Sequence, residues 1–566
     1  MTTAISLFLL LFMTLSVVLS ATVLFLHFSL STILLLFSFI LSCIIVWKYC
    51  CLKRQNYIIA ILIGLAIIVC CTLFSSLTID NTWDGAAYHK NAVGFLKEGW
   101  NPYFETPQDF LDDKSALQNA DQSPLQWVEV YPKGTWYFAA LVYQLTGSIE
   151  AGKCYTILFA IIFGLQLFGH CYKNKISLPA SFVIAWIGGA NPIVLAQFQT
   201  YYLDGVVGCV IMGIILCFLE WLDDPKDCPH NSISVIQVVC YIVWACNLKF
   251  SVILFAVTAC AIYILCLWIH RKAFPIADTC LLAVSGIGSC VVVGWSPYIV
   301  NIIRHQNPFY GFFGLFTAAT FDKEFGISGL GNVGRFFVSL FARTSHGNYH
   351  TLRETLKIPF TFKTEELEYY AIPDARLGGF GIFFSGLFLC SLIYLAFKLV
   401  LEKRRNAIRI QTIFIFTITI VNFIELANLS GTHTARYIPH FFGVILYLLA
   451  DIAKKKSPLG KHLQINKLSF MILVFFSIGN TLPWYKVSLD RTTAGIQAQQ
   501  ELTALGRESE KGTIYNITFY SNAFNGIQYN LIDHNISYQY CVQDATTLTD
   551  YSILSGFNWI YYKAQD

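Results

Sequence analysis

Residues 57–90 read YIIAILIGLAIIVCCTLFSSLTIDNTWDGAAYHK, and this stretch decides how the chain is organised. Residues 57–78 carry no charged side chain, and a transmembrane helix needs about 20 largely apolar residues. Acidic, aromatic and basic residues begin directly after this run, at Asp80 and Asp84. The stretch therefore predicts a membrane span that delivers a polar loop to one membrane surface.

The composition of the whole chain agrees with this interpretation. Of 566 residues, 55% are hydrophobic and only 13% are charged, whereas an ordinary soluble domain has about 25% charged residues. Lys and Arg (38) nearly balance Asp and Glu (34), so the concentrated basic face of a nucleic-acid-binding protein is not indicated. Most of the 18 cysteines lie in apolar runs, where a thiol behaves as a small hydrophobic group, and we expect them to be reduced.

Further apolar runs lie on both sides of residues 57–78. Because a bilayer cannot satisfy an open backbone, each run of about 20 residues is expected to be a helix. The sequence predicts an all-α polytopic membrane protein with about thirteen spans, near residues 5–26, 29–48, 57–78, 153–170, 178–197, 205–222, 232–248, 251–270, 278–303, 377–400, 410–429, 437–453 and 468–485.

Basic residues predict the orientation of these spans, since cytoplasmic loops are enriched in Lys and Arg. Each basic cluster follows an even-numbered span: Lys48, Lys53 and Arg54; Lys173 and Lys175; Arg271 and Lys272; Lys403, Arg404, Arg405 and Arg409; and Lys454, Lys455 and Lys456. With a cytoplasmic N-terminus, the long loops 79–152 and 304–376 and the tail are external. If the first run is instead a cleaved signal sequence, the other spans keep this orientation.

The chain changes character near residue 486. We expect residues 1–485 to form the transmembrane module and residues 486–566 to form a small external α/β domain. The module shows no inverted half-to-half pattern of broken helices, which disfavours a secondary transporter.

The external loop after the third span contains the first candidate site residues. Asp84 lies just beyond the hydrocarbon edge, where a partly desolvated carboxylate can act as a general base. Tyr88 and His89 follow on the same short segment and are candidate substrate-binding residues. The alternative is that Asp84 only caps the helix that starts near Ala86.

A second acidic residue, Asp204, stands in a short external turn before the sixth span. It either caps that span, which the local sequence favours, or joins Asp84 in a two-carboxylate site. Lys133 opens an apolar run to Gly147 that is too short to span and is expected to lie on the external face. Lys133 either binds a lipid phosphate there or snorkels to the interface.

Cations stand at the external ends of two later spans. Arg436 is followed by Tyr437 at the start of the twelfth span, and a cation at a helix start opposes the macrodipole, which indicates an anionic partner. Glu425 is one candidate partner, and a substrate anion is the other. Lys249 at the external end of the seventh span is a similar cation with weaker support.

The order and sidedness of these features resemble the membrane glycosyltransferases of the GT-C fold, especially the branch of protein O-mannosyltransferases and lipid A aminoarabinose transferases. The resemblance covers about residues 57–455, and Lys133 departs from the pattern because Gly, not Pro, follows it. The features that carry it are Asp84, the Pro132–Gly147 segment, Lys173 and Lys175, Asp204, Lys249, Asn307-Pro308-Phe309-Tyr310, and Arg436, Tyr437 and Pro439.

The resemblance implies a polyprenyl-phosphate-linked sugar as donor and transfer on the non-cytoplasmic side of the membrane. The acceptor would be a hydroxyl of a glycan, a lipid or a protein. The chain also shows no Gly-rich phosphate loop for a nucleotide sugar. The compact layout favours a bacterial inner membrane with the site facing the periplasm, and a eukaryotic endomembrane location stays open.

These residues predict an inverting glycosyltransferase in which Asp84 is the general base. Lys133, Arg436 and Tyr437 are expected to stabilise the leaving phosphate, and Asp204 to orient the acceptor. The alternative that Asp84 and Asp204 hold Mg²⁺ or Mn²⁺ stays open, although two isolated carboxylates are a sparse metal site. The competing hypotheses are a flippase for a lipid-linked saccharide and a non-catalytic scaffold that presents the tail, and the charge-poor spans disfavour the first.

Overall fold

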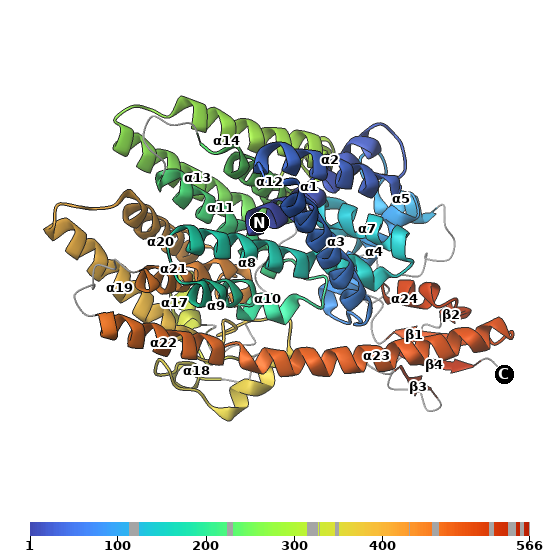
Figure 1. Cartoon of the computed structure of the whole chain (residues 1–566). Coiled ribbons are helices and arrows are strands. Elements are labelled where there is room, and N and C mark those ends of the chain that lie inside the picture. The colour runs from blue at the N-terminus through green and yellow to red at the C-terminus, as the bar shows by residue number, and fades with distance from the viewer. Residues whose placement is uncertain are drawn as a thin grey trace.

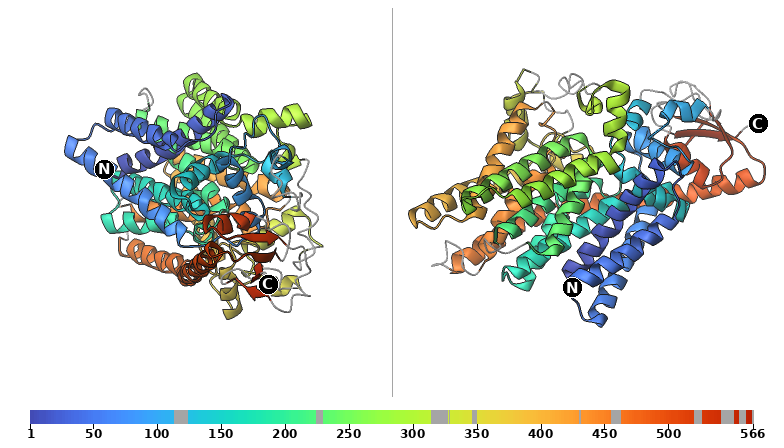
Figure 2. Two further views of the ribbon diagram at one scale, coloured as in Figure 1. Left: turned by 90° about the vertical axis from the view of Figure 1, so that its right-hand side faces the viewer. Right: turned by 90° about the horizontal axis from the view of Figure 1, so that it is seen from above.

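The structure is a computed structural model of the chain. It describes residues 1–112, 124–223, 230–313, 327, 329–345, 350–429, 431–454, 463–519, 526–540, 551–554 and 560–564. Long helices run side by side in a bundle, and the C-terminal strands lie at one end of it (Figures 1 and 2).

Ten helical segments in the described residues are long and apolar enough to cross a membrane, which supports an integral membrane protein. They are α1 (Thr2–Phe25), α2 (Ile33–Cys50), α3 (Arg54–Ser76), η3 (Ile149–Cys154) with α8 (Tyr155–Lys173), α11 (Asp204–Asp223), α13 (Phe250–Arg271), α14 (Ile276–Gly288) with η4 (Ser289–Val293), α19 (Phe384–Arg404), α20 (Ile410–Asn428), and α22 (Leu463–Gly479) leading into α23 (Leu482–Glu510). Shorter apolar helices occupy the other three predicted spans: α9 (Leu178–Gly189), α12 (Ser232–Leu248), and η9 (Pro439–Phe441) with α21 (Phe442–Ala453).

Two predicted spans are interrupted helices. The run 178–197 divides into α9 and α10 (Pro192–Gln197), because the Asn191 side chain caps the second helix and Pro192 has no N–H to donate. The run 278–303 leaves helical backbone geometry at Ser296, directly before Pro297, as expected for a residue that precedes proline. Its second part is η5 (Trp295–Ile299) and α15 (Val300–His305).

The basic loops that follow even-numbered predicted spans lie together at one end of the bundle, here called the basic-loop end. Residues of four of these loops line two adjacent cavities that share His170: Leu52, Lys173, Lys175, Arg409 and Lys454. This agrees with the common side predicted for these loops. Lys455 and Lys456 lie outside the described residues.

The opposite end, here called the Asp84 end, carries the long loops. Their helices are η1 (Gly85–His89), α4 (Lys90–Lys97), α5 (Pro107–Asp112), α6 (Leu125–Val130), α7 (Gly134–Thr146), α16 (Tyr310–Phe313), α17 (Asn332–Leu340), α18 (Leu352–Thr355), η7 (Thr364–Ala371) and η8 (Ala435–Tyr437). Residues 132–147 contain α7 at this end, the predicted external side, but the helix is buried in the bundle and does not lie on its surface. Trp136, Tyr137 and Tyr143 of α7 are fully buried, and α7 packs among α1, α4, α12 and η3.

The tail folds as the expected small α/β unit, although its first helix, α23, begins before residue 486. A four-stranded sheet in the order β2-β1-β4-β3 shares a hydrophobic core with α23 and α24 (Gln528–Asp533). The strands are β1 (Tyr515–Phe519), β2 (Tyr538–Tyr540), β3 (Ser552–Ile553) and β4 (Ile560–Ala564), and only the β1–β2 pair is parallel. Ala86 of η1 belongs to the hydrophobic core of this unit, so the tail holds the Asp84 loop.

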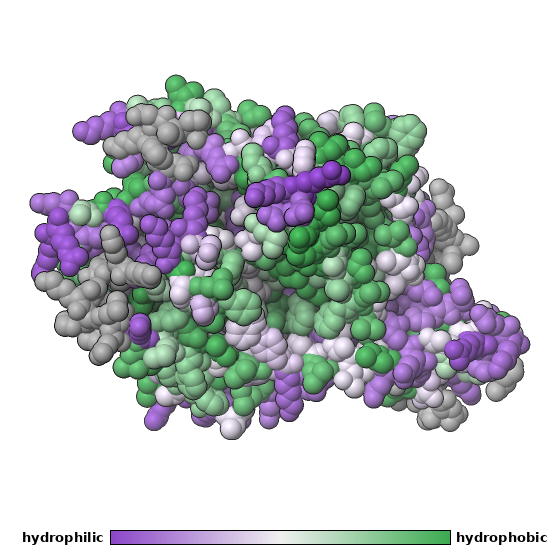
Figure 3. Space-filling model, viewed as in Figure 1, coloured by the Kyte–Doolittle hydropathy of each residue, from purple (hydrophilic) through white to green (hydrophobic). Residues whose placement is uncertain are grey.

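The surface pattern agrees with a membrane-embedded bundle. In Figure 3, hydrophobic residues cover the region of α3, and hydrophilic residues gather over the C-terminal half of α23 and its sheet. The described cysteines are all free thiols, as the sequence predicts.

Candidate active site

Six charged side chains from five segments of the chain meet at the Asp84 end. We call this group the charge cluster; it consists of Asp84, Asp204, Lys249, Asp374, Arg376 and Arg436. Asp84 precedes η1, Asp204 begins α11, Lys249 precedes α13, and Arg436 lies in η8. Residues far apart in sequence thus form one site, as the sequence predicts for four of the six.

Arg436 stands at the centre of the charge cluster. Its Nη1 lies 3.0 Å from Asp84 Oδ2 and 3.6 Å from Asp204 Oδ2. Its Nε lies 2.8 Å from Asp374 Oδ1, outside the hydrogen-bonding direction of that N–H. The prediction that Arg436 has an anionic partner is confirmed, but the partner is not Glu425, which accepts a hydrogen bond from Thr258 instead.

Backbone pairing fixes the position of Arg436. Its backbone N–H donates to the carbonyl of Ala375 at 3.0 Å, and the N–H of Ala435 donates to the carbonyl of Arg376 at 3.1 Å. Arg376 Nε in turn donates to Asp374 Oδ2 at 2.8 Å. The segment before α19 therefore holds the guanidinium of Arg436 against Asp84.

Asp204 is engaged by side chains. Lys249 Nζ donates to its Oδ1 at 2.9 Å, and Gln197 Nε2 donates to its Oδ2 at 3.2 Å. The N–H of Gly205, at the start of α11, donates to Gln197 Oε1 at 2.8 Å. The expectation that Asp204 caps α11 is wrong, because in the described residues Gln197 accepts this bond and Asp204 binds cations.

Aromatic rings contact two cations of the charge cluster, Arg436 and Lys249. The guanidinium of Arg436 lies 4.7 Å from the ring centre of Tyr202 and 5.0 Å from that of Tyr437. Lys249 Nζ lies 4.4 Å from the Tyr437 ring, and Arg436 Nη2 donates to the Tyr437 hydroxyl at 3.3 Å. Such cation–π contacts hold charged groups in a partly dry site.

Asp84 remains accessible although its surroundings are buried. Its side chain is 17% exposed and does not cap η1 with a hydrogen bond, so the capping alternative is wrong. Burial raises the pKa of Asp84, Arg436 opposes this rise, and the neighbouring Asp374 carboxylate adds to it. A carboxyl with a raised pKa has the property required of a general base near neutral pH.

The two cations stay charged. Burial works to lower the pKa of Lys249, but the Asp204 carboxylate together with Tyr131 and Tyr437 outweighs it, so the pKa of Lys249 is raised. Burial likewise opposes the charge on Arg436, and Tyr437, Asp374 and Asp84 together raise its pKa above the usual value. Both side chains can therefore hold an anion.

Tyr88 and His89 lie beside the charge cluster, not in it. Tyr88 is 7% exposed, and its ring lies 4.3 Å from that of His89. His89 Nδ1 accepts a hydrogen bond from Trp136 Nε1 at 2.7 Å. Burial, Lys249 and Arg436 lower the pKa of His89 well below the usual value, so His89 is a neutral packing residue.

Lys133 also lies apart from the charge cluster. It is 1% exposed, and its Nζ donates to the carbonyls of Glu129 and Tyr131 at 2.7 and 2.9 Å. Burial lowers its pKa well below the usual value. Neither snorkelling nor contact with the charge cluster is seen in the described residues, and Lys133 instead holds the turn before α7.

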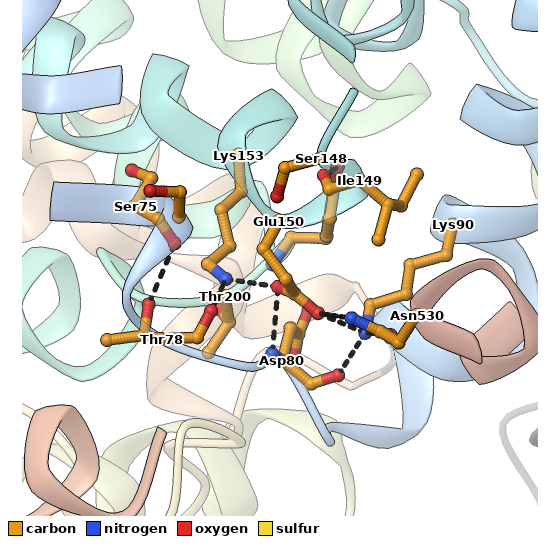
Figure 4. Close-up of polar contacts among 12 residues, drawn as sticks. Ser75, Thr78, Asp80, Lys90, Ser148, Ile149, Glu150, Lys153, Thr200 and Asn530 are labelled. Atoms are coloured by element: carbon orange, nitrogen blue, oxygen red, sulfur yellow. Dashed lines mark hydrogen bonds and ion pairs between the residues drawn. The ribbon is translucent and has the colours of Figure 1, made fainter. Parts of the chain in front are cut away.

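A second set of buried polar and charged residues packs against the Asp84 loop. Figure 4 shows Glu150 between Lys90 and Lys153, with Asp80 and Asn530 beside them. We call these five residues the support network. Lys90 Nζ donates to Glu150 Oε1 at 2.6 Å, to the Asp80 carbonyl at 2.7 Å and to Asn530 Oδ1 at 2.9 Å.

The support network also connects the two acidic turns. Asp80 Oδ2 accepts the N–H of Tyr201 at 2.7 Å, which places the Asp204 turn against the Asp84 loop. A Cβ on Gly85 would lie 2.0 Å from Asp80 Oδ2, so only glycine allows this approach. Asn530 brings the tail into the same contact.

Asp374 and Arg376 were missed by sequence reasoning. They stand directly before the tenth predicted span, at its external end, which is the same signal that identified Arg436. Their position at the external end of a span, which Arg436 shares, would have identified them, whereas their residue types alone would not.

The charge cluster does not fit a divalent cation. In the described parts of the chain no three His, Cys, Asp or Glu side chains are arranged to hold a metal ion. The guanidinium of Arg436 lies among the three carboxylates at the position that such an ion would need.

No protein-family model matches the chain, and no curated protein matches it. Among solved structures, the chain is similar to the crystal structure of ArnT from Cupriavidus metallidurans bound to undecaprenyl phosphate, with 11% sequence identity, 86% of each chain covered and a TM-score of 0.36. ArnT is a GT-C aminoarabinose transferase, in the group that the sequence resembles.

Proposed function

We propose that this chain is a membrane glycosyltransferase that moves a sugar from a polyprenyl-phosphate-linked donor to an acceptor hydroxyl on the non-cytoplasmic side. The observation that carries the proposal is the charge cluster: a partly exposed carboxylate, Asp84, lies beside the guanidinium of Arg436 at one end of an apolar bundle. The donor class is the one that the sequence resemblance implies.

Asp84 acts as the general base. The acceptor oxygen attacks the anomeric carbon in line, its proton passes to Asp84, and the bond from the anomeric carbon to the phosphate oxygen breaks with inversion. The exposed part of Asp84 lets an acceptor hydroxyl approach, whereas Asp80, four residues earlier, is 1% exposed and already accepts backbone hydrogen bonds. A base in this role contributes roughly 10²–10⁴-fold to the rate.

Arg436 and Lys249 stabilise the leaving phosphate. Arg436 Nη2 donates to the Tyr437 hydroxyl and to no carboxylate in the described residues, so this edge of the guanidinium can turn to a substrate anion. Arg binds phosphate through a planar fork, and Lys249 adds a point charge. Asp204 holds Lys249 in place through their ion pair. Asp204 also orients the acceptor.

Base and leaving-group steps are coupled through Arg436. While Asp84 is ionised, it holds Nη1 at 3.0 Å. When Asp84 takes the acceptor proton, this attraction falls, and at the same moment negative charge grows on the departing phosphate. The guanidinium is then free to strengthen its contact with the phosphate, which is where transition-state charge stabilisation is needed.

A release assay tests the proposal. Detergent-purified protein is incubated with a polyprenyl-phosphate sugar and candidate acceptors, and the polyprenyl phosphate produced is measured. We expect release by the wild type and by Glu425→Gln, a matched carboxylate variant outside the charge cluster. The protein is also reconstituted in liposomes. If the intact lipid-linked sugar crosses the bilayer and no polyprenyl phosphate is released, the flippase hypothesis is supported and the proposal is overturned.

The same assay tests the metal alternative. Because Arg436 occupies the space among the carboxylates, we expect activity to persist after EDTA treatment. Loss of activity that Mg²⁺ or Mn²⁺ restores would show that a cation takes part.

A further inference from the structure

A cavity of about 460 Å³ lies between α8, α11, α20 and α21, away from the charge cluster. Its volume is within the range of small-molecule sites, about 300–1,000 Å³. We call it the basic-end groove, because Lys175, Arg409 and Lys454 line it at the basic-loop end. None of the proposed catalytic steps uses it.

The walls of the basic-end groove are apolar along most of its length. They are formed by Phe163, Leu167, Leu216, Leu219, Ile415 and Ile418. On α20 the lining runs from Gln411 to Asn422, a rise of about 16 Å at 1.5 Å per residue. This length is close to half of the roughly 30 Å hydrocarbon core, so the groove matches the depth of one leaflet.

The mouth of the basic-end groove has an excess of cations. Lys175 and Lys454 form no ion pair with any carboxylate in the described residues, and Arg409 is 46% exposed beside Glu402 at 3.4 Å. The two carboxylates of the lining have partners of their own. Lys398 and the Tyr394 hydroxyl hold Asp451 at 2.7 Å each, and Gln411 donates to Asp223.

The inner end of the basic-end groove has unsatisfied polar atoms. Both ring nitrogens of His440, which is 4% exposed, and Oδ1 of Asn422 have no hydrogen-bond partner in the described residues, and both residues line the groove. Buried polar atoms normally have partners, so the groove is shaped to be occupied. It is polar at each end and apolar between, over the depth of a leaflet.

We propose that the basic-end groove binds an anionic phospholipid of the leaflet on the predicted cytoplasmic side. The phosphate lies between Lys175 and Lys454, with Arg409 near, and an acyl chain follows the apolar wall past Leu219. Charge complementarity selects an anionic headgroup, and the length of the apolar section selects an acyl chain. This site is independent of sugar transfer.

Thermal stability in nanodiscs tests this site. The wild type is compared in pure phosphatidylcholine and in phosphatidylcholine with phosphatidylglycerol, and we expect phosphatidylglycerol to raise the thermal midpoint. Lys175→Gln with Lys454→Gln should lose this rise and keep the midpoint in pure phosphatidylcholine. The control, Lys403→Gln with Arg404→Gln, removes the same charge from exposed positions at the same end outside the groove and should keep the rise.

A second variant separates the groove from general surface charge. Leu219→Trp fills the apolar wall and leaves every cation in place, so it should also lose the phosphatidylglycerol effect. An equal effect of phosphatidylglycerol in the wild type, the double lysine variant and Leu219→Trp would overturn the proposal. An equal loss in the Lys403 and Arg404 control would also overturn it, since bulk charge would then explain the binding.

Discussion

The support network and the charge cluster lie on the two sides of one short loop, and both contain buried acids and bases. In the support network, Lys90, Glu150 and Lys153 are at most 1% exposed. Lys90 has three hydrogen-bond acceptors, and Glu150 accepts from both lysines and from the N–H of Asp80. The fixed partners of these side chains leave no approach for a ligand.

The charge cluster contains three carboxylates and three cations, so its formal charge is also balanced. Three of its side chains nevertheless stay partly accessible: Asp84 and Asp374 are each 17% exposed, and Lys249 is 22% exposed. In the described residues, Arg436 Nη2 donates a hydrogen bond only to the Tyr437 hydroxyl. Accessibility and an unfilled donor edge, not charge, therefore distinguish the charge cluster from the support network.

Replacing Asp84 should give the largest effect of this comparison. Asp84→Asn keeps the shape and removes the base, so we expect the rate of sugar transfer to fall roughly 10²–10⁴-fold with little change in thermal midpoint. The initial rate of sugar transfer by Asp84→Asn is compared with the rates of the wild type and of the control Glu425→Gln. Near-wild-type transfer by Asp84→Asn would remove the general-base role.

Replacing Glu150 should show the opposite behaviour. Glu150→Gln leaves Lys90 and Lys153 buried without an anion, and breaking such a pair costs about 3–5 kcal/mol of unfolding free energy. We expect denaturation in mixed micelles to begin at lower denaturant concentration. If Glu150→Gln kept full stability and lost activity, the support network would take part in the reaction.

Arg436→Lys sharpens the comparison within the charge cluster. The variant keeps the charge and loses the planar fork that contacts Asp84, Asp374 and Tyr437. We expect a loss of roughly 10²-fold in kcat, the size seen when one transition-state donor is removed. An unchanged rate would show that a point charge suffices.

Asp374→Asn should move the pH profile. The Asp374 carboxylate helps to raise the pKa of Asp84, so its removal lowers that pKa. Activity needs ionised Asp84 and rises with pH through its pKa, so the acidic limb should shift to lower pH. The check is kcat/KM against pH, and a shift toward higher pH would contradict the assigned geometry.

The docking of the tail should give the smallest effect. Burial raises the pKa of Asp533 to about 6, and its carboxyl accepts hydrogen bonds from Tyr143 and from the N–H of Ile149. A raised carboxyl pKa means that docking is strongest below about pH 4 and weakens as the pH rises through about 6.

For this partly exposed group we expect a change of about 1 kcal/mol. To measure this change, the thermal midpoints of the wild type and Asp533→Asn are compared at pH 4 and at pH 8. An equal difference at both pH values would show that the Asp533 proton is not linked to docking.

Much of this arrangement is visible in the sequence, because the bilayer imposes simple rules. Length and hydropathy locate the spans, and the basic loops assign them to two ends. Asp84, Asp204, Lys249 and Arg436 could be identified because each stands at the same end of a predicted span. Side chains at one end of a bundle are already close, so their meeting needs little further information.

The remaining assignments needed tertiary contacts. Asp80 and Asp84 both follow the third span, and tertiary contacts distinguish them, because Asp80 is buried and accepts the N–H groups of Thr82 and Tyr201. Lys133 and His89 were expected to contact substrate, but Lys133 Nζ donates to neighbouring carbonyls and His89 Nδ1 accepts from Trp136. Which of several nearby partners a side chain selects depends on packing that no local pattern records.

The most direct test is a cryo-electron microscopy map of the protein in nanodiscs with added polyprenyl phosphate. The charge cluster account predicts phosphate density within hydrogen-bonding reach of Arg436 Nη2 and Lys249 Nζ, beside Asp84. Phosphate density that lies well away from all three residues would contradict it.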